Sequence, residues 1–94
     1  MKINGLFFLR HIIDKLYVKH NVLKEEVEEV FAQNPWIIFV EKGHFPGEDV
    51  YAALGQTEAG RYLKVFFVYK ADKQALIVSA RDMTHTDRRR YERK

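Results

Sequence analysis

The spacing of apolar residues changes partway along the chain, from a helical period to a strand period. Near the start, one set of residues recurs at intervals of three and four: Leu6, Leu9, Ile12, Ile13, Leu16 and His20. This spacing predicts an amphipathic helix over roughly residues 6–20. Asn21 follows this stretch, and asparagine tolerates the left-handed conformation in which many helices end.

A second helix is predicted over residues 24–33, because Val27, Val30 and Phe31 fall on one of its faces. Asn34-Pro35 ends it, since a residue that precedes proline avoids helical angles. The link between the two predicted helices is short. We therefore expect them to form a helical hairpin.

Beyond residue 35 the sequence is typical of strands and turns. Residues 36–40 form a run rich in β-branched and aromatic residues, and three further strands are predicted over residues 49–56, 62–69 and 75–81. They are separated by a loop at residues 43–47 and by turns at residues 58–60 and 71–73, and Thr84 begins a last helix. This order predicts an α+β fold in which the N-terminal helical hairpin packs on a four-stranded antiparallel sheet, followed by a C-terminal helix. We expect a single domain over residues 1–94.

The third predicted strand is apolar on both faces. Leu63, Val65, Phe67 and Tyr69 alternate with Tyr62, Lys64, Phe66 and Val68. A strand of this kind lies at the centre of a sheet. The helical hairpin can cover one of its faces, and either the last helix or a partner chain must cover the other.

Composition narrows the classes of function. Hydrophobic residues make up 47% of the chain, and there is no cysteine, which excludes disulfides and thiol chemistry. The apolar run at residues 6–9 is too short for a signal peptide or a membrane span, so we expect a cytoplasmic protein without a membrane partner. The net charge of +3 is uneven, because residues 22–60 are acidic and residues 81–94 are basic. This distribution favours a local anion site over a general coat for nucleic acid.

The basic end of the chain contains the candidate site. Arg81 ends the last predicted strand, and an arginine there can spread its planar fork over two phosphate oxygens. The alternative is a salt bridge from Arg81 to Asp82 or Asp87. Asp87 could act as a general base or could orient Arg81. Its spacing from Thr84 is also that of a capping box, which would give it a structural role at the start of the last helix.

Three stretches together resemble a known family. They are Val78-Ser79-Ala80-Arg81 with Asp87-Arg88-Arg89-Arg90-Tyr91, then Lys19-His20-Asn21-Val22 with Glu25-Glu26-Val27-Glu28-Glu29-Val30-Phe31, and Leu54-Gly55-Gln56-Thr57 with Gly60-Arg61. Taken in the order of the chain, these stretches resemble the BrnT toxins of bacterial type II toxin–antitoxin systems, within the RelE/ParE-like group. The chain departs from the family pattern where Asp87 replaces a glutamate and Asn21 a glycine, and it lacks the family's Trp-Asp-Glu opening.

The resemblance implies a compact RelE-like ribonuclease fold and RNA cleavage without a metal ion, by attack of a 2′-hydroxyl on the adjacent phosphate. It also implies a cognate antitoxin of ribbon-helix-helix type. The expected assembly is either a homodimer of this chain or a hetero-oligomer of toxin and antitoxin. Seven residues are candidates for the RNA site: Arg81, Asp87 and Arg90 for catalysis, and Lys64, Arg88, Tyr91 and Lys19 for binding. The alternative function is a protein- or RNA-binding module that has lost catalysis.

Some polar residues of the family motifs can instead have a purely structural role. Tyr91 can pack its ring against the sheet instead of contacting RNA, and His20 lies on the apolar stripe of the first helix, which favours a structural role. His44 and His85 have no partners at metal-ligand spacing, and the chain has no phosphate-binding loop. We therefore predict no metal site and no cofactor.

Overall fold

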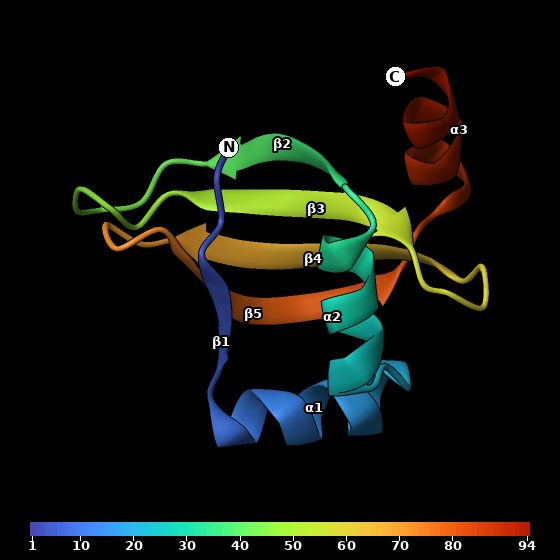
Figure 1. Ribbon diagram of the computed structural model, residues 1–94, viewed down its shortest axis with the longest axis horizontal. Coiled ribbons are helices and arrows are strands. Elements are labelled where there is room, and N and C mark those ends of the chain that lie inside the picture. Colours follow the sequence, from blue (N-terminus) through green and yellow to red (C-terminus); the bar gives the residue numbers. More distant parts are fainter.

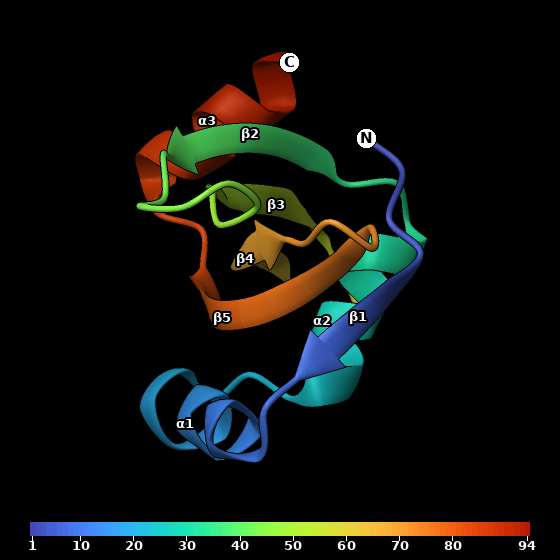
Figure 2. The same ribbon diagram turned by 90° about the vertical axis from the view of Figure 1, so that its left-hand side faces the viewer.

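A five-stranded sheet separates two helices on one side from a third helix on the other (Figures 1 and 2). The computed structural model describes all residues from 1 to 94. The elements in chain order are β1 (Gly5–Phe8), α1 (Arg10–His20), α2 (Lys24–Ala32), β2 (Trp36–Glu41), β3 (Val50–Gln56), β4 (Tyr62–Tyr69), β5 (Gln74–Asp82) and α3 (His85–Arg93). No helix combines the length and apolar character needed to cross a membrane.

The strands are arranged in the order β1-β5-β4-β3-β2. From β2 to β5 they form an antiparallel meander, as predicted, and β4 lies between β3 and β5. The α+β class is therefore confirmed. The prediction of a wholly antiparallel sheet of four strands is wrong, because β1 adds a fifth strand that runs parallel to β5.

Residues 5–8 form this added strand, although their spacing predicted the first turn of a helix. Leu6 and Phe8 pack against the core while Phe7 between them is 49% exposed, which is the alternation of a strand. The three-residue step from Leu6 to Leu9 also fits a helix, so the pattern alone is ambiguous over so short a run. Pairing with the edge of β5 decides the outcome, and α1 starts only at Arg10.

The two N-terminal helices do not form the predicted hairpin. α1 packs on β5, whereas α2 packs on β3 and β4, and Figure 1 shows them running in different directions. Asn21 takes the left-handed conformation expected of it, with φ 52°. The next residue, Val22, is fully buried, and its backbone N–H donates a hydrogen bond to the carbonyl of Leu16. With Val22 buried, the chain changes direction between α1 and α2. Each helix therefore covers a different part of the sheet.

The core lies between this face of the sheet and the two helices. The β4 side chains Leu63, Val65 and Phe67 are fully buried there, as their alternation predicted. They meet the buried residues Leu16 of α1 and Val30 of α2 within one hydrophobic cluster. β4 is thus the central strand, and its alternate residues face the opposite side.

Arg61, just before β4, ties the helices to the sheet. Its guanidinium donates to the carbonyls of Asn21 (2.7 Å) and His20 (3.2 Å) at the end of α1. It also pairs with Glu26 at the start of α2 (3.1 Å) and with Asp82 at the end of β5 (2.7 Å). The hydrogen bond from Arg61 lowers the pKa of Asp82. One side chain therefore fixes the corner between α1 and α2 against the end of β5.

We predict that Arg61→Met lowers the free energy of unfolding by about 2 kcal/mol, because the carbonyls of α1 and the carboxylate of Glu26 lose a charged donor. Asp82→Asn is the matched control. Its side chain is 64% exposed, so the cost should stay below about 1 kcal/mol. Urea unfolding followed by circular dichroism measures both. Equal losses in the two variants would contradict this role of Arg61.

Candidate functional site

Two cations meet where β4 and β5 run side by side. Lys64 lies opposite Arg81 in the antiparallel register, on the face of the sheet turned away from α1 and α2. Both were predicted to contact RNA, but the sequence did not place them as neighbours. Two adjacent positive charges on one face favour an anionic ligand.

The carboxylate of Asp87 lies between these two cations. Its Oδ1 accepts a hydrogen bond from Lys64 Nζ at 3.1 Å, and its Oδ2 accepts one from Arg81 Nη1 at 2.9 Å. The Asp87 residue is only 6% exposed, although it belongs to the most polar helix of the chain. The salt bridge from Arg81 to Asp87, one of the expected alternatives, is thus present.

Asp87 also completes the predicted capping box of α3. Its Oδ2 accepts from the backbone N–H of Thr84 at 2.9 Å, and its own N–H donates to Thr84 Oγ1 at 3.0 Å. These bonds satisfy free donors at the start of the helix. The same carboxylate therefore caps α3 and fixes that helix to the sheet through Lys64 and Arg81.

This environment determines the charge of Asp87. Burial by itself would raise the pKa of its carboxyl group, but the hydrogen bonds from Thr84, Arg81 and Lys64 outweigh it and hold the pKa well below its ordinary range. A carboxylate with so low a pKa is a weak proton acceptor at neutral pH. The geometry favours the orienting role of Asp87 over the role of general base.

Arg81 keeps unused hydrogen-bond donors. Only its Nη1 is engaged, with Asp87 and with the backbone carbonyl of Asp82 at 3.0 Å. Nε and Nη2 have no partner within the protein, and the side chain is 32% exposed. An arginine held on one side and free on the other is suited to a bidentate bond with phosphate.

The other predicted residues of α3 lie around this centre. Arg88 stacks on the ring of Tyr62, with its Cζ 3.9 Å from the ring centroid, and Tyr91 meets the same ring edge to face at 6.1 Å. Arg90 lies 5.8 Å from the ring of Trp36. Tyr91 therefore packs its ring against the sheet, which is the structural role considered for it from the sequence.

Lys19 lies apart from this group. It is exposed near the end of α1 and makes no ion pair with the site, so its RNA-binding role stays a prediction. His20 next to it is half-buried, in line with a structural role. No group of three or more His, Cys, Asp or Glu side chains gathers at metal-binding distance.

Sequence reasoning did not assign Tyr62 and Trp36 to the site. Tyr62 shares a face with Lys64 by simple strand alternation, so the period of β4 already placed the ring beside the cation. Trp36 lies two strands away, and no local pattern connects it to α3. Its place beside Arg90 depends on the register of β2, β3 and β4.

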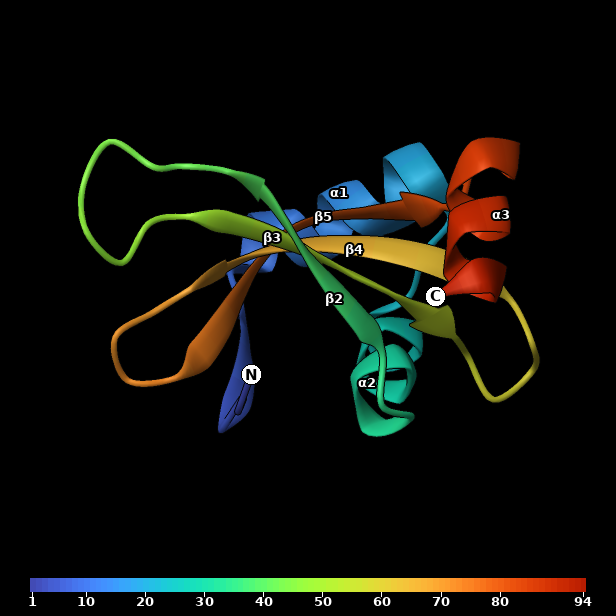
Figure 3. The same ribbon diagram turned by 90° about the horizontal axis from the view of Figure 1, so that it is seen from above.

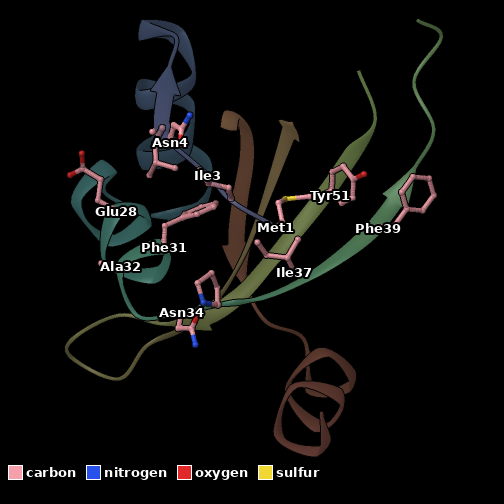
Figure 4. Close-up of a pocket in the computed structure, with 13 residues that line it drawn as sticks. Met1, Ile3, Asn4, Glu28, Phe31, Ala32, Asn34, Ile37, Phe39 and Tyr51 are labelled. Atoms are coloured by element: carbon pink, nitrogen blue, oxygen red, sulfur yellow. The ribbon is translucent and has the colours of Figure 1, made fainter. Parts of the chain in front are cut away.

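The largest cleft in the structure lies on the other side of the sheet. It has a volume of about 660 Å³ and opens between the N-terminal segment, α2 and the strands β2 and β3. Figure 4 shows the apolar side chains that gather in it: Met1, Ile3, Phe31 and Ile37. Its lining includes Glu28 but no lysine or arginine side chain, in contrast to the end of the sheet where Lys64 and Arg81 meet.

Fold and site together define a small α+β protein with two neighbouring cations, Lys64 and Arg81, at one end of its sheet. The family described as "Ribonuclease toxin, BrnT, of type II toxin-antitoxin system" matches residues 13–87. Since the match spans well over half of the chain, the chain belongs to this family of ribonuclease toxins, whose type II systems include a protein antitoxin. No curated protein matches the sequence.

We predict that Asp87→Asn lowers the free energy of unfolding by about 2 kcal/mol at pH 7, because Lys64 and Arg81 lose their anionic partner. The pKa of Asp87 is lower in the folded chain than in the unfolded chain, so its contribution is present above the unfolded value near 4 and is lost as the pH falls further. The difference between wild type and variant should therefore shrink from pH 5 toward pH 2.

Urea unfolding at several pH values measures this difference. Asp14→Asn is the control, because Asp14 is exposed on α1 and makes no ion pair. Its unfolding should follow the wild-type pH dependence. A constant gap between wild type and Asp87→Asn at all pH values would show that the carboxylate charge does not stabilise the fold.

Proposed function

We propose that the chain cleaves RNA at the end of the sheet where Lys64 and Arg81 meet. Membership of the BrnT family supports ribonuclease activity. The observation that carries the location is the arrangement of Arg81, whose Nη1 is fixed by Asp87 while Nε and Nη2 point to no protein partner. We also propose that the BrnT family belongs to the RelE/ParE-like group of toxins.

In the proposed reaction, the 2′-oxygen of one nucleotide attacks the phosphorus that links it to the next. The 2′-hydroxyl proton leaves to solvent, and the bond from phosphorus to the 5′-oxygen breaks. The products are a 2′,3′-cyclic phosphate and a 5′-hydroxyl, which takes up a proton. Negative charge builds on the non-bridging oxygens in the transition state, and Arg81 donates to them.

The other residues act around Arg81. Asp87 is a positioning residue, because its carboxylate fixes the guanidinium without facing the substrate. Lys64 adds a second positive charge 3.1 Å from Asp87 and keeps further N–H donors for the phosphate. Arg90 is exposed and makes no ion pair, so it can approach the same phosphate or the next one. Arg88 contacts the neighbouring nucleotide. Tyr91, whose ring packs on Tyr62, offers its hydroxyl to a phosphate, and Lys19 is an outlying contact for longer RNA.

The proposal extends to the setting of the reaction. Cleavage requires no metal ion, because the positive charge that it needs comes from Arg81 and Lys64. The protein acts in the bacterial cytoplasm. A cognate antitoxin of ribbon-helix-helix type neutralises it by forming a hetero-oligomer, which contains either one toxin chain or a toxin homodimer. The family description, which names a type II system, supports the protein nature of this antitoxin.

We predict that Arg81→Ala lowers the rate of RNA cleavage by about 10²–10³-fold, since one donor to the transition state is lost. It should also relieve the growth defect on expression. Arg89→Ala is the control, because Arg89 is an exposed arginine of α3 whose side chain makes no ion pair. Gel analysis of a labelled RNA and circular dichroism of each variant check both. If the purified wild type leaves RNA intact at high concentration, the chain is a binding module instead.

A second prediction concerns the attacking group and the metal ion. Replacing the 2′-hydroxyl by hydrogen throughout the oligonucleotide should abolish cleavage, whereas excess EDTA should leave the rate unchanged. Mass spectrometry should find a 2′,3′-cyclic phosphate on the upstream product. Cleavage of the all-deoxy strand, or loss of activity in EDTA that returns with Mg²⁺, would exclude this mechanism.

A further inference from the structure

The sheet face turned away from α1 and α2 is covered only at one end. α3 lies over that end, where it meets Tyr62 and Trp36, and Figure 3 shows it beside the ends of β4 and β5. The rest of the face carries apolar side chains that are half-buried or exposed: Phe7, Ile38, Val50, Phe66, Val68 and Leu76. We call these six residues the apolar band. A contiguous apolar surface of this kind is a candidate site for contact with a partner.

The apolar band begins at the proposed site. The ring of Phe66 has Lys64 Nζ at 5.4 Å and Arg81 Cζ at 5.6 Å from its centroid. At its other end the band runs into a groove of about 450 Å³ beside Phe7 and Leu76, with Lys70 and Asp72 at its wall. A ligand that follows the band therefore meets apolar side chains along its length and the two site cations at one end.

The charges on the two sides of the sheet differ. On the helix side, α2 carries four glutamates against Lys24, whereas α1 carries Arg10, Lys15 and Lys19 against Asp14. On the side of the apolar band, the ring of Phe66 has the cations Lys64 and Arg81 beside it, and Asp87 pairs with both of them. A segment that combines apolar side chains with carboxylates fits this side. A nucleic acid would match the cations but not the length of exposed apolar surface.

We propose that the antitoxin docks an acidic, apolar segment along the apolar band and ends with a carboxylate at Arg81. This inference rests on the proposed function, because it takes Arg81 as the phosphate site that must be blocked. The carboxylate binds the free Nε and Nη2 donors of Arg81, as Asp87 binds Nη1. Inhibition then works by occupancy, since one anion excludes the other from the same donors.

The test uses the product of the reading frame adjacent to this one as the candidate antitoxin. Its affinity for the purified chain is measured by calorimetry without RNA. Phe66→Asp should weaken binding by at least about 100-fold, because a charge enters the centre of an apolar interface. Phe39→Asp is the matched control. Phe39 is 56% exposed but lines the cleft on the helix side, so its substitution should leave the affinity within about twofold.

Circular dichroism confirms that each variant folds. If Phe66→Asp does not fold, Phe7→Asp decides the question, because Phe7 is 49% exposed at the edge strand and tolerates a charge there. A folded variant of the apolar band that binds with unchanged affinity overturns the proposal. So does a loss of binding in Phe39→Asp alone, which would place the antitoxin in the helix-side cleft.

Two further outcomes separate this inference from the ribonuclease proposal. If Phe66→Asp keeps its affinity for the antitoxin but loses RNA cleavage, the apolar band belongs to the RNA and the docking proposal is wrong. If the wild type cleaves no RNA and Phe66→Asp still loses the antitoxin, the docking surface stands and the ribonuclease proposal fails. A wild-type chain that does not bind the adjacent product at about 10 µM also overturns the docking proposal.

Discussion

The carboxylate of Asp87 is the group on which both the last helix and the candidate site depend. It is buried, and a buried charge is stable only when hydrogen bonds replace the water it has lost. Thr84, Arg81 and Lys64 supply those bonds from the helix cap and from two strands. Because all three meet at one group, the position of α3 and the orientation of the two cations are set together.

The end of β5 connects this site to the rest of the fold. Arg81 and Asp82 are neighbours in sequence, so their side chains point to opposite faces of the sheet. Arg81 reaches Asp87 in the first turn of α3. Asp82 reaches Arg61, which contacts the end of α1 and the start of α2. Two adjacent residues of one strand thus join the helical side of the protein to the cationic side. A change in the register of β5 would separate both contacts at once.

Several features could be predicted from the sequence because their causes are local. Alternation in β4 identified the central strand, and the spacing of Thr84 and Asp87 identified the capping box. The features that escaped prediction depend on contacts between distant segments. Residues 5–8 form a strand because β5 offers an edge, and the corner at Val22 exists because the core buries that side chain. Likewise, the ion pair of Lys64 with Asp87 joins residues that only the folded sheet brings together.

The central claim is that Asp87 acts through Arg81, and a double-mutant cycle on the rate of RNA cleavage tests it most directly. The four proteins are the wild type, Asp87→Asn, Arg81→Ala and the double variant, each confirmed as folded at the assay temperature. If Asp87 positions Arg81, Asp87→Asn lowers the rate in the wild type but has little further effect once Arg81 is alanine. If the two substitutions instead multiply their separate losses, Asp87 acts independently of Arg81 and the account of the site is contradicted.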